Sequence, residues 1–171
     1  MDQQKHPLHV ALMEAISNAL ENMAFEETEM ADEHSEIPET PDQLLWISLP
    51  VVKPISGAVV LRLSEKCAQR ITGDIYADLD IGDITEDSIM DALGEILNTI
   101  VGRFLTILLP AEQSFDLGFP KTGKGDPPFS KNKIIASLIV DASGYILTGM
   151  VVGEDFRRFL IEDPHKAEVR S

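Results

Sequence analysis

A carboxylate and a carboxamide, Glu95 and Asn98, stand three residues apart between two glycines, Gly94 and Gly102. In a helix, side chains three or four positions apart lie on one face, so Asp91 would join them there. A carboxamide accepts a hydrogen bond through its oxygen and donates through its nitrogen, and it adds no charge that would repel an anion. Asn98 is therefore suited to hold and orient a water molecule.

The two glycines on this face oppose helix formation, because each costs roughly 1 kcal/mol relative to alanine. They remove side chains next to Glu95 and Asn98, so another surface could come close. That surface could be a neighbouring element of the same chain, and Glu95 and Asn98 would then be ordinary surface residues. It could equally belong to a partner.

A long helix must carry these residues, and the sequence predicts it between Thr85 and Pro110. Thr85 can cap its start, and Glu86 and Asp87 place negative charge in the first turn, where the helix dipole favours it. No proline follows until Pro110. The opposite side of the predicted helix is apolar and is formed by Leu93, Ile96, Leu97, Ile100, Val101 and Phe104.

The pattern Asp91-x-x-x-Glu95-x-x-Asn98, followed later by Pro120, resembles the signature helix of the CheC, CheX and FliY family of chemotaxis phosphatases. Residues 55–61 (Ile-Ser-Gly-Ala-Val-Val-Leu) and 64–66 (Ser-Glu-Lys) look like the strand and short helix that precede this motif in the family. The resemblance covers residues 43–152, and it is nearer to the CheX branch than to the two-site CheC branch. A second motif is missing on the first predicted helix, since Ala15 and Ala19 stand three positions before Asn18 and Asn22.

The resemblance implies a phosphatase that hydrolyses the phosphoaspartate of a CheY-like response regulator. Asn98 would orient the attacking water, and Glu95 would pair with the active-site lysine of the regulator. The chain itself would bind no cofactor, because the regulator would supply Mg²⁺. The remaining residues of the motif are expected at the partner-binding surface: Asp91, Gly94, Gly102 and Pro120. The alternative is a non-catalytic regulator-binding or scaffold module that uses the same helix.

The predicted fold class is α+β, with a mostly antiparallel sheet of five or six strands packed by two long helices. Strands are expected at residues 44–52, 56–63, 114–119, 133–140 and 145–152, the last two as a hairpin. The first long helix is expected at residues 7–27, and a short helix from residue 64 to residue 71 is expected to end at Gly73. Residues 118–125 are expected to form a mobile glycine-rich loop. Whether residues 156–161 form a last helix stays open.

One domain is predicted over residues 1–171, with an acidic flexible connector at 28–42 and a polar tail at 162–171. Residues 26–42 contain eight acidic side chains and no Lys or Arg. The net charge of −15 makes nucleic acid and anionic membranes poor partners. With no signal peptide and no long apolar run, we expect a cytoplasmic protein. The single cysteine, Cys67, and the four scattered histidines do not form a metal-binding pattern.

A homodimer is also suggested by the family resemblance. The strands at 44–52 and 133–152 are long and apolar, and at least one must lie at a sheet edge, where it could pair with a second copy. Lys53 and Pro54 could block one edge, and the acidic residues 26–42 could cover another.

Overall fold

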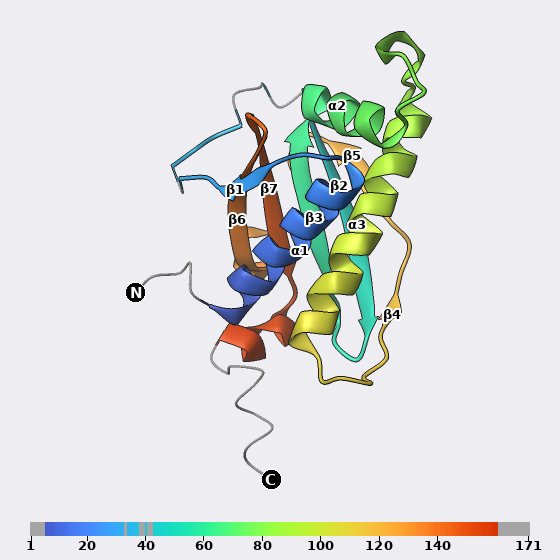
Figure 1. Cartoon of the computed structure of the whole chain (residues 1–171). Helices are drawn as coiled ribbons and strands as arrows, with labels where there is room; N and C mark the ends of the chain where they lie inside the picture. The colour runs from blue at the N-terminus through green and yellow to red at the C-terminus, as the bar shows by residue number, and fades with distance from the viewer. Residues whose placement is uncertain (1–5, 33, 38–39, 41–42, 161–171) are drawn as a thin grey trace.

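The fold is a seven-stranded antiparallel sheet with helices on one face (Figure 1). A computed structural model describes residues 6–160 except 33, 38–39 and 41–42. The strand order is β1-β6-β7-β3-β2-β4, and β5 also pairs with β2. The strands are β1 (Thr28–Met30), β2 (Leu44–Lys53), β3 (Gly57–Ser64), β4 (Asp116–Leu117), β5 (Lys121–Lys124), β6 (Ile134–Ala142) and β7 (Tyr145–Val152). The α+β class with an antiparallel sheet and two long helices is confirmed.

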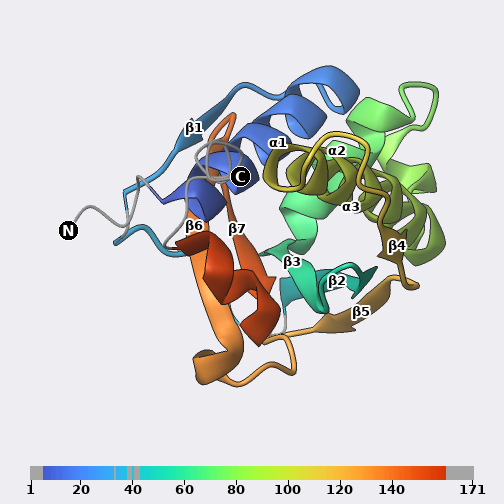
Figure 2. The same ribbon diagram turned by 90° about the horizontal axis from the view of Figure 1, so that it is seen from below.

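Two long helices, α1 (Pro7–Met23) and α3 (Glu86–Leu108), lie side by side over the sheet, as the view along its edge shows (Figure 2). Helix α3 has the predicted bounds, and Thr85 caps it by a reciprocal pair of hydrogen bonds with Ser88. Helix α1 ends four residues earlier than predicted. Phe25 adopts a positive φ of 55°, a backbone conformation that stops a helix.

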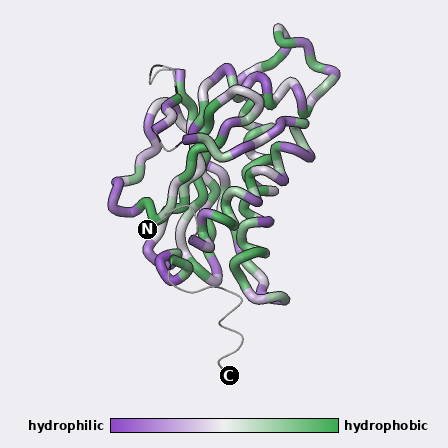
Figure 3. Tube along the Cα trace, turned by 60° about the vertical axis from the view of Figure 1, so that its left-hand side comes forward, coloured by the Kyte–Doolittle hydropathy of each residue, from purple (hydrophilic) through white to green (hydrophobic). Residues whose placement is uncertain are grey.

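The main core lies between the helices and the sheet, where the inner helix faces meet alternate strand residues. In Figure 3 hydrophobic positions gather in this layer, and hydrophilic positions follow the connecting segments. Phe104 of α3 and Phe156 of the 3₁₀ helix η5 (Glu154–Leu160) are fully buried, with ring centroids 5.9 Å apart. Helix η5 closes the end of the core, which answers the question left open for this segment.

Helix α2 (Glu65–Ile75) continues through Gly73, so the prediction that Gly73 ends it is wrong. One internal glycine costs about 1 kcal/mol, and packing of an amphipathic face can offset that cost. Cys67, Ala68 and Ile71 supply that packing, since all three are buried in the main core. The Ser64 side chain accepts a hydrogen bond from the Cys67 amide and caps the helix as predicted.

Half of the predicted glycine-rich loop at 118–125 is a strand, β5, which corrects that prediction. Strand β5 pairs with residues 45–48 of β2, and β4 is only two residues long. Gly123 explains the pairing, because a Cβ atom there would lie 2.5 Å from the Trp46 ring. The absence of a side chain lets the indole ring lie against the strand.

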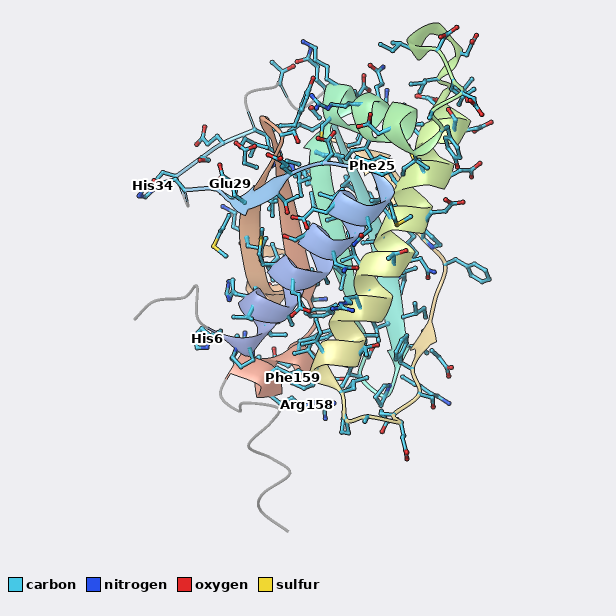
Figure 4. The ribbon with its side chains drawn as sticks, viewed as in Figure 1. His6, Phe25, Glu29, His34, Arg158 and Phe159 are labelled. Atoms are coloured by element: carbon cyan, nitrogen blue, oxygen red, sulfur yellow. The ribbon has the colours of Figure 1, made fainter. Side chains whose placement is uncertain are left out.

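The predicted acidic connector begins with a strand. Residues 28–30 form β1, which pairs with residues 140–142 of β6. Phe25 and Glu29 mark this passage from α1 into β1 in Figure 4. The β6–β7 hairpin is confirmed, with positive φ at both Ser143 and Gly144, as a tight two-residue turn requires. The predicted tail at 162–171 lies outside the described residues. Within the described part of the chain, no helix is long and apolar enough to cross a membrane.

Candidate functional site

The outward face of α3 carries the three polar residues singled out by the sequence. Asp91, Glu95 and Asn98 are all exposed, whereas Ile96 and Leu97, on the opposite side of the helix, are fully buried. The helix therefore anchors itself in the core and presents one carboxamide and two carboxylates to solvent. Side chains project freely from this side of α3 in Figure 4.

The two glycines of this face leave open space beside the polar side chains. A Cβ atom built on Gly94 or on Gly102 would have no neighbouring atom within 4 Å, apart from the backbone of its own helix. Among the described residues no element occupies this space, so the interpretation that these glycines admit a neighbouring element of the chain is wrong. The two glycines therefore lower the stability of the helix, and they leave its surface beside Glu95 and Asn98 accessible.

Several contacts hold α3 in place at both ends. Near its start, the Lys124 ammonium lies 3.3 Å from the Glu65 carboxylate of α2 and 3.7 Å from Glu86 of α3. In its second half, Arg103 binds Glu14 of α1 at 2.9 Å. These pairs are exposed and each contributes little energy. Together with the buried face, they fix the direction in which the helix presents Glu95 and Asn98.

Tyr76, at the end of α2, is a site residue that sequence reasoning did not identify. Burial raises the pKa of its hydroxyl, and the nearby carboxylates of Glu95 and Asp91 raise that pKa further. The hydroxyl therefore stays protonated at neutral pH. No local pattern could have revealed Tyr76, because its position depends on how the ends of α2 and α3 come together.

The surroundings of the site are strongly acidic. Residues 71–102 contain eight acidic side chains and no Lys or Arg. A surface of this kind attracts a partner with positive charge near the contact. The described residues contain no group of three or more His, Cys, Asp or Glu side chains that could hold a metal ion.

Pro120, the remaining residue of the predicted set, is not on this helix. It stands in the exposed link between β4 and β5, next to Phe119, whose side chain is 89% exposed. The structure thus brings Asp91, Glu95 and Asn98 together on one helix face but leaves Pro120 on a separate element. This helix face can place an amide and a carboxylate against a reactive group on another molecule.

Comparison with protein families gives a match to the model described as chemotaxis phosphatase CheX, over residues 49–140. This range includes the whole of α3 and its exposed polar face. A search of the curated proteins gave no match to the chain.

Solved structures with the same fold include three from this group of chemotaxis proteins. CheX from Borrelia burgdorferi, in a complex with CheY, BeF3 and Mg²⁺, has a TM-score of 0.63 at 21% identity and covers 84% of this chain and 95% of its own. CheX from Desulfovibrio desulfuricans has a TM-score of 0.66 at 16% identity, with 84% and 97% covered. FliY from Thermotoga maritima has a TM-score of 0.62 at 14% identity, with 96% and 93% covered.

Proposed function

This chain belongs to the chemotaxis phosphatase CheX family, and from that premise we propose that it hydrolyses the phosphoaspartate of a CheY-like response regulator. The observation that carries the proposal is the open face of α3, on which Glu95 and Asn98 stand exposed beside two glycines, and no described residue fills the space at either glycine. A flat polar face on a fixed helix can enter the concave active site of another protein. The complex of Borrelia burgdorferi CheX with CheY gives the family precedent for such a partner.

The chemistry requires little more than a positioned water molecule. Phosphoryl transfer has a loose transition state, and catalysis depends on alignment and on stabilisation of charge. We propose that the Asn98 carbonyl oxygen accepts a hydrogen bond from water and aligns its oxygen with the phosphorus atom. The water oxygen then bonds to phosphorus, and the bond between phosphorus and the aspartyl oxygen breaks. Inorganic phosphate leaves and the aspartate carboxylate of the regulator is restored.

Glu95 is proposed to hold the complex together by pairing with the active-site lysine of the regulator. Its side chain stands one turn before Asn98 on the same face, so one docking movement places both groups. Magnesium bound by the regulator would balance the charge of the phosphoryl group. In this proposal the chain supplies only the amide and the anchoring carboxylate.

Asn98→Ala tests the catalytic assignment. With a CheY-like regulator phosphorylated by a low-molecular-weight donor, the variant should bind nearly as well as wild type. The accelerated loss of phosphate should slow by about a hundredfold or more, the usual effect of removing one positioned transition-state group, about 3 kcal/mol. Asn22→Ala is the matched control, since it removes another exposed helical amide, on α1. A decay rate that Asn98→Ala leaves unchanged would refute the role of Asn98.

Glu95→Lys tests the docking assignment. It places a positive charge against the lysine of the regulator, and losing one partner of a desolvated charge pair typically costs about 2–5 kcal/mol. Titration of the phosphorylated regulator should therefore show no complex at concentrations that saturate wild type. Retained affinity would place the docking surface elsewhere on the chain.

The same measurements separate the phosphatase from a non-catalytic docking module. A module that only binds would form the Glu95-dependent complex, but wild type would not speed phosphate loss beyond the regulator's own rate. The exposed amide at Asn98 favours the phosphatase, because a surface that only docks has no need of a group that orients water.

A further inference from the structure

The segment between α2 and α3, residues 76–84, exposes two large apolar side chains. Ile81 is 82% exposed and Leu79 is 36% exposed, in a segment that also contains Asp78, Asp80 and Asp83. In Figure 1 this segment projects beyond the ends of both helices, and in Figure 3 it alternates between hydrophobic and hydrophilic positions. Leaving an isoleucine this exposed forgoes stabilisation that burial would give. The exposure suggests that another molecule covers it.

Leu79 and Ile81 line one side of an open depression of about 560 Å³. Its other lining residues are Lys66, Gln69, Arg70, Gly73 and Asp74 of α2 and Tyr145 of β7. Gly73 contributes no side chain here, and a Cβ atom at this position would make only an ordinary contact of 3.7 Å with Ile84. The depression is open, so Leu79 and Ile81 are accessible to a partner on this side.

This segment is continuous with the polar face of α3. It begins at Tyr76, the residue after α2, and leads directly into Thr85, the residue that caps α3. A 3₁₀ turn at Ile81–Asp83 gives it local structure. Glu95 lies only about 14 Å along the helix from its first residue, Glu86, so a protein-sized partner docked on Glu95 and Asn98 can also reach this segment.

We propose that residues 76–84 form a second contact for the same regulator, with Leu79 and Ile81 filling an apolar depression whose rim is basic. This inference rests on the proposed function and adds the feature by which the regulator is selected. The flanking carboxylates define the chemistry of the rim, because Asp78, Asp80 and Asp83 are exposed on the projecting segment itself, whereas the cations of the depression, Lys66 and Arg70, lie across it on α2. A second copy of this chain would bring acid against acid, which disfavours self-association through this segment.

The double variant Leu79→Ser/Ile81→Ser tests the inference. This contact lies away from the reacting atoms, so it binds the ground state and the transition state equally. Its loss should raise KM for the phosphorylated regulator roughly tenfold or more, as expected for lost burial of two apolar side chains, and leave kcat within about twofold. Val52→Ser is the matched control, because Val52 is a 51% exposed apolar residue near the other end of the molecule.

A charge variant tests the basic rim separately. Asp80→Asn/Asp83→Asn should slow association with the phosphorylated regulator at low salt and make the association rate less dependent on salt, since fewer charges steer the encounter. The circular dichroism spectrum and thermal midpoint of each variant should match wild type, because these side chains are exposed.

The outcomes distinguish this inference from the proposed function. If wild type accelerates phosphate loss and the Leu79/Ile81 variant keeps its KM, the second contact is refuted and the phosphatase stands. A fall in kcat at constant KM would also refute it, because the segment would then act by shifting α3 rather than by binding. If wild type does not accelerate phosphate loss, the proposed function fails, and titration of the variant against the phosphorylated regulator still decides whether residues 79 and 81 contribute to binding.

Discussion

Gly94 is the residue at which helix stability and partner docking make opposite demands. It stands inside a 23-residue helix, directly before Glu95, and a Cβ atom there would lie more than 4 Å from every described residue outside its own stretch of helix. Alanine would therefore fit without steric cost and would favour the helix. A glycine at this position fits a partner that approaches the helix backbone closely.

Gly94→Ala should consequently raise stability and lower activity together. We expect the free energy of unfolding to increase by up to about 1 kcal/mol, measured by urea denaturation. Affinity for the phosphorylated regulator should fall, and Gly94→Leu should weaken it more, because a larger side chain keeps the surfaces further apart. If both variants bind the regulator as wild type does, the docking face does not include this position.

At the residue scale, the sequence predicted which residues share the exposed face of α3. It did not predict which residues of other elements lie near that helix. Helical periodicity fixes which residues share a face, so Asp91, Glu95 and Asn98 were placed together from spacing alone. Tyr76 and Lys124 reach this end of α3 from other elements, and only the packing of α2 and β5 brings them there. The proximity of such residues is a property of the tertiary structure and leaves no local signal.

At the scale of the elements, a partly buried cluster of charges joins α2 to Glu26, the first of the acidic residues 26–42. Glu26 is only 3% exposed, and its carboxylate accepts hydrogen bonds from the Arg70 guanidinium at 2.8 and 3.4 Å. Arg70 also lies over the Tyr145 ring, 5.1 Å from the centroid. Burial raises the pKa of Asp74, and its hydrogen bond to Glu26 raises that pKa further, although Arg70 opposes the shift.

The raised pKa of Asp74 predicts a pH dependence of stability. The folded state holds this proton more tightly than the unfolded state, so the contribution is favourable at low pH and is lost as pH rises through the folded-state pKa. Asp74→Asn keeps a donor for Glu26 without the charge. We expect it to raise the thermal midpoint at pH 7 and to have little effect near pH 4, with Asp78→Asn as an exposed control. An equal change at both pH values would show that the charge of Asp74 does not matter.

The elements that the sequence missed share a physical cause. Strand β5 has no alternating apolar pattern, because it lies at the sheet edge and its pairing depends on Trp46 lying against Gly123. Strand β1 is three residues long, and backbone pairing with residues 140–142 defines it. By contrast, α3 and the β6–β7 hairpin carry their own caps, turns and apolar periodicity, and these local signals were sufficient.

At the scale of the whole molecule, the two edges of the sheet differ in how they are covered. On one side, β5 and β4 together pair with β2 at residues 45–48, 51 and 53. On the other side, β1 pairs with β6 only at residues 140–142, and the Ala31 amide reaches the Ile139 carbonyl. Among the described residues, residues 134–138 of β6 have no strand beside them on this edge, although His9 Nε2 donates to the Ser137 carbonyl at 3.1 Å.

The homodimer stays a prediction, and we predict its contact at residues 134–138 of β6. Two copies related by a two-fold axis could pair these edges antiparallel and extend the sheet, leaving one Glu95–Asn98 face on each subunit. Light scattering at micromolar concentration should then give about twice the chain mass of 18.8 kDa. Because each subunit carries a net charge of −15, repulsion opposes the dimer, and added salt should strengthen it.

Ser137→Pro tests this edge directly. The carbonyls of residues 137 and 139 both accept hydrogen bonds from outside the β6–β7 pair, so the Ser137 amide faces the open edge as well. Proline removes that amide and should abolish the dimer without breaking the β6–β7 ladder, whereas Ser137→Ala should leave it intact. The monomeric variant should still dephosphorylate the regulator, since α3 lies on the face of the sheet rather than at this edge. A wild-type mass of one chain at high salt would rule out the dimer, and a Ser137→Pro dimer would move the contact to another surface.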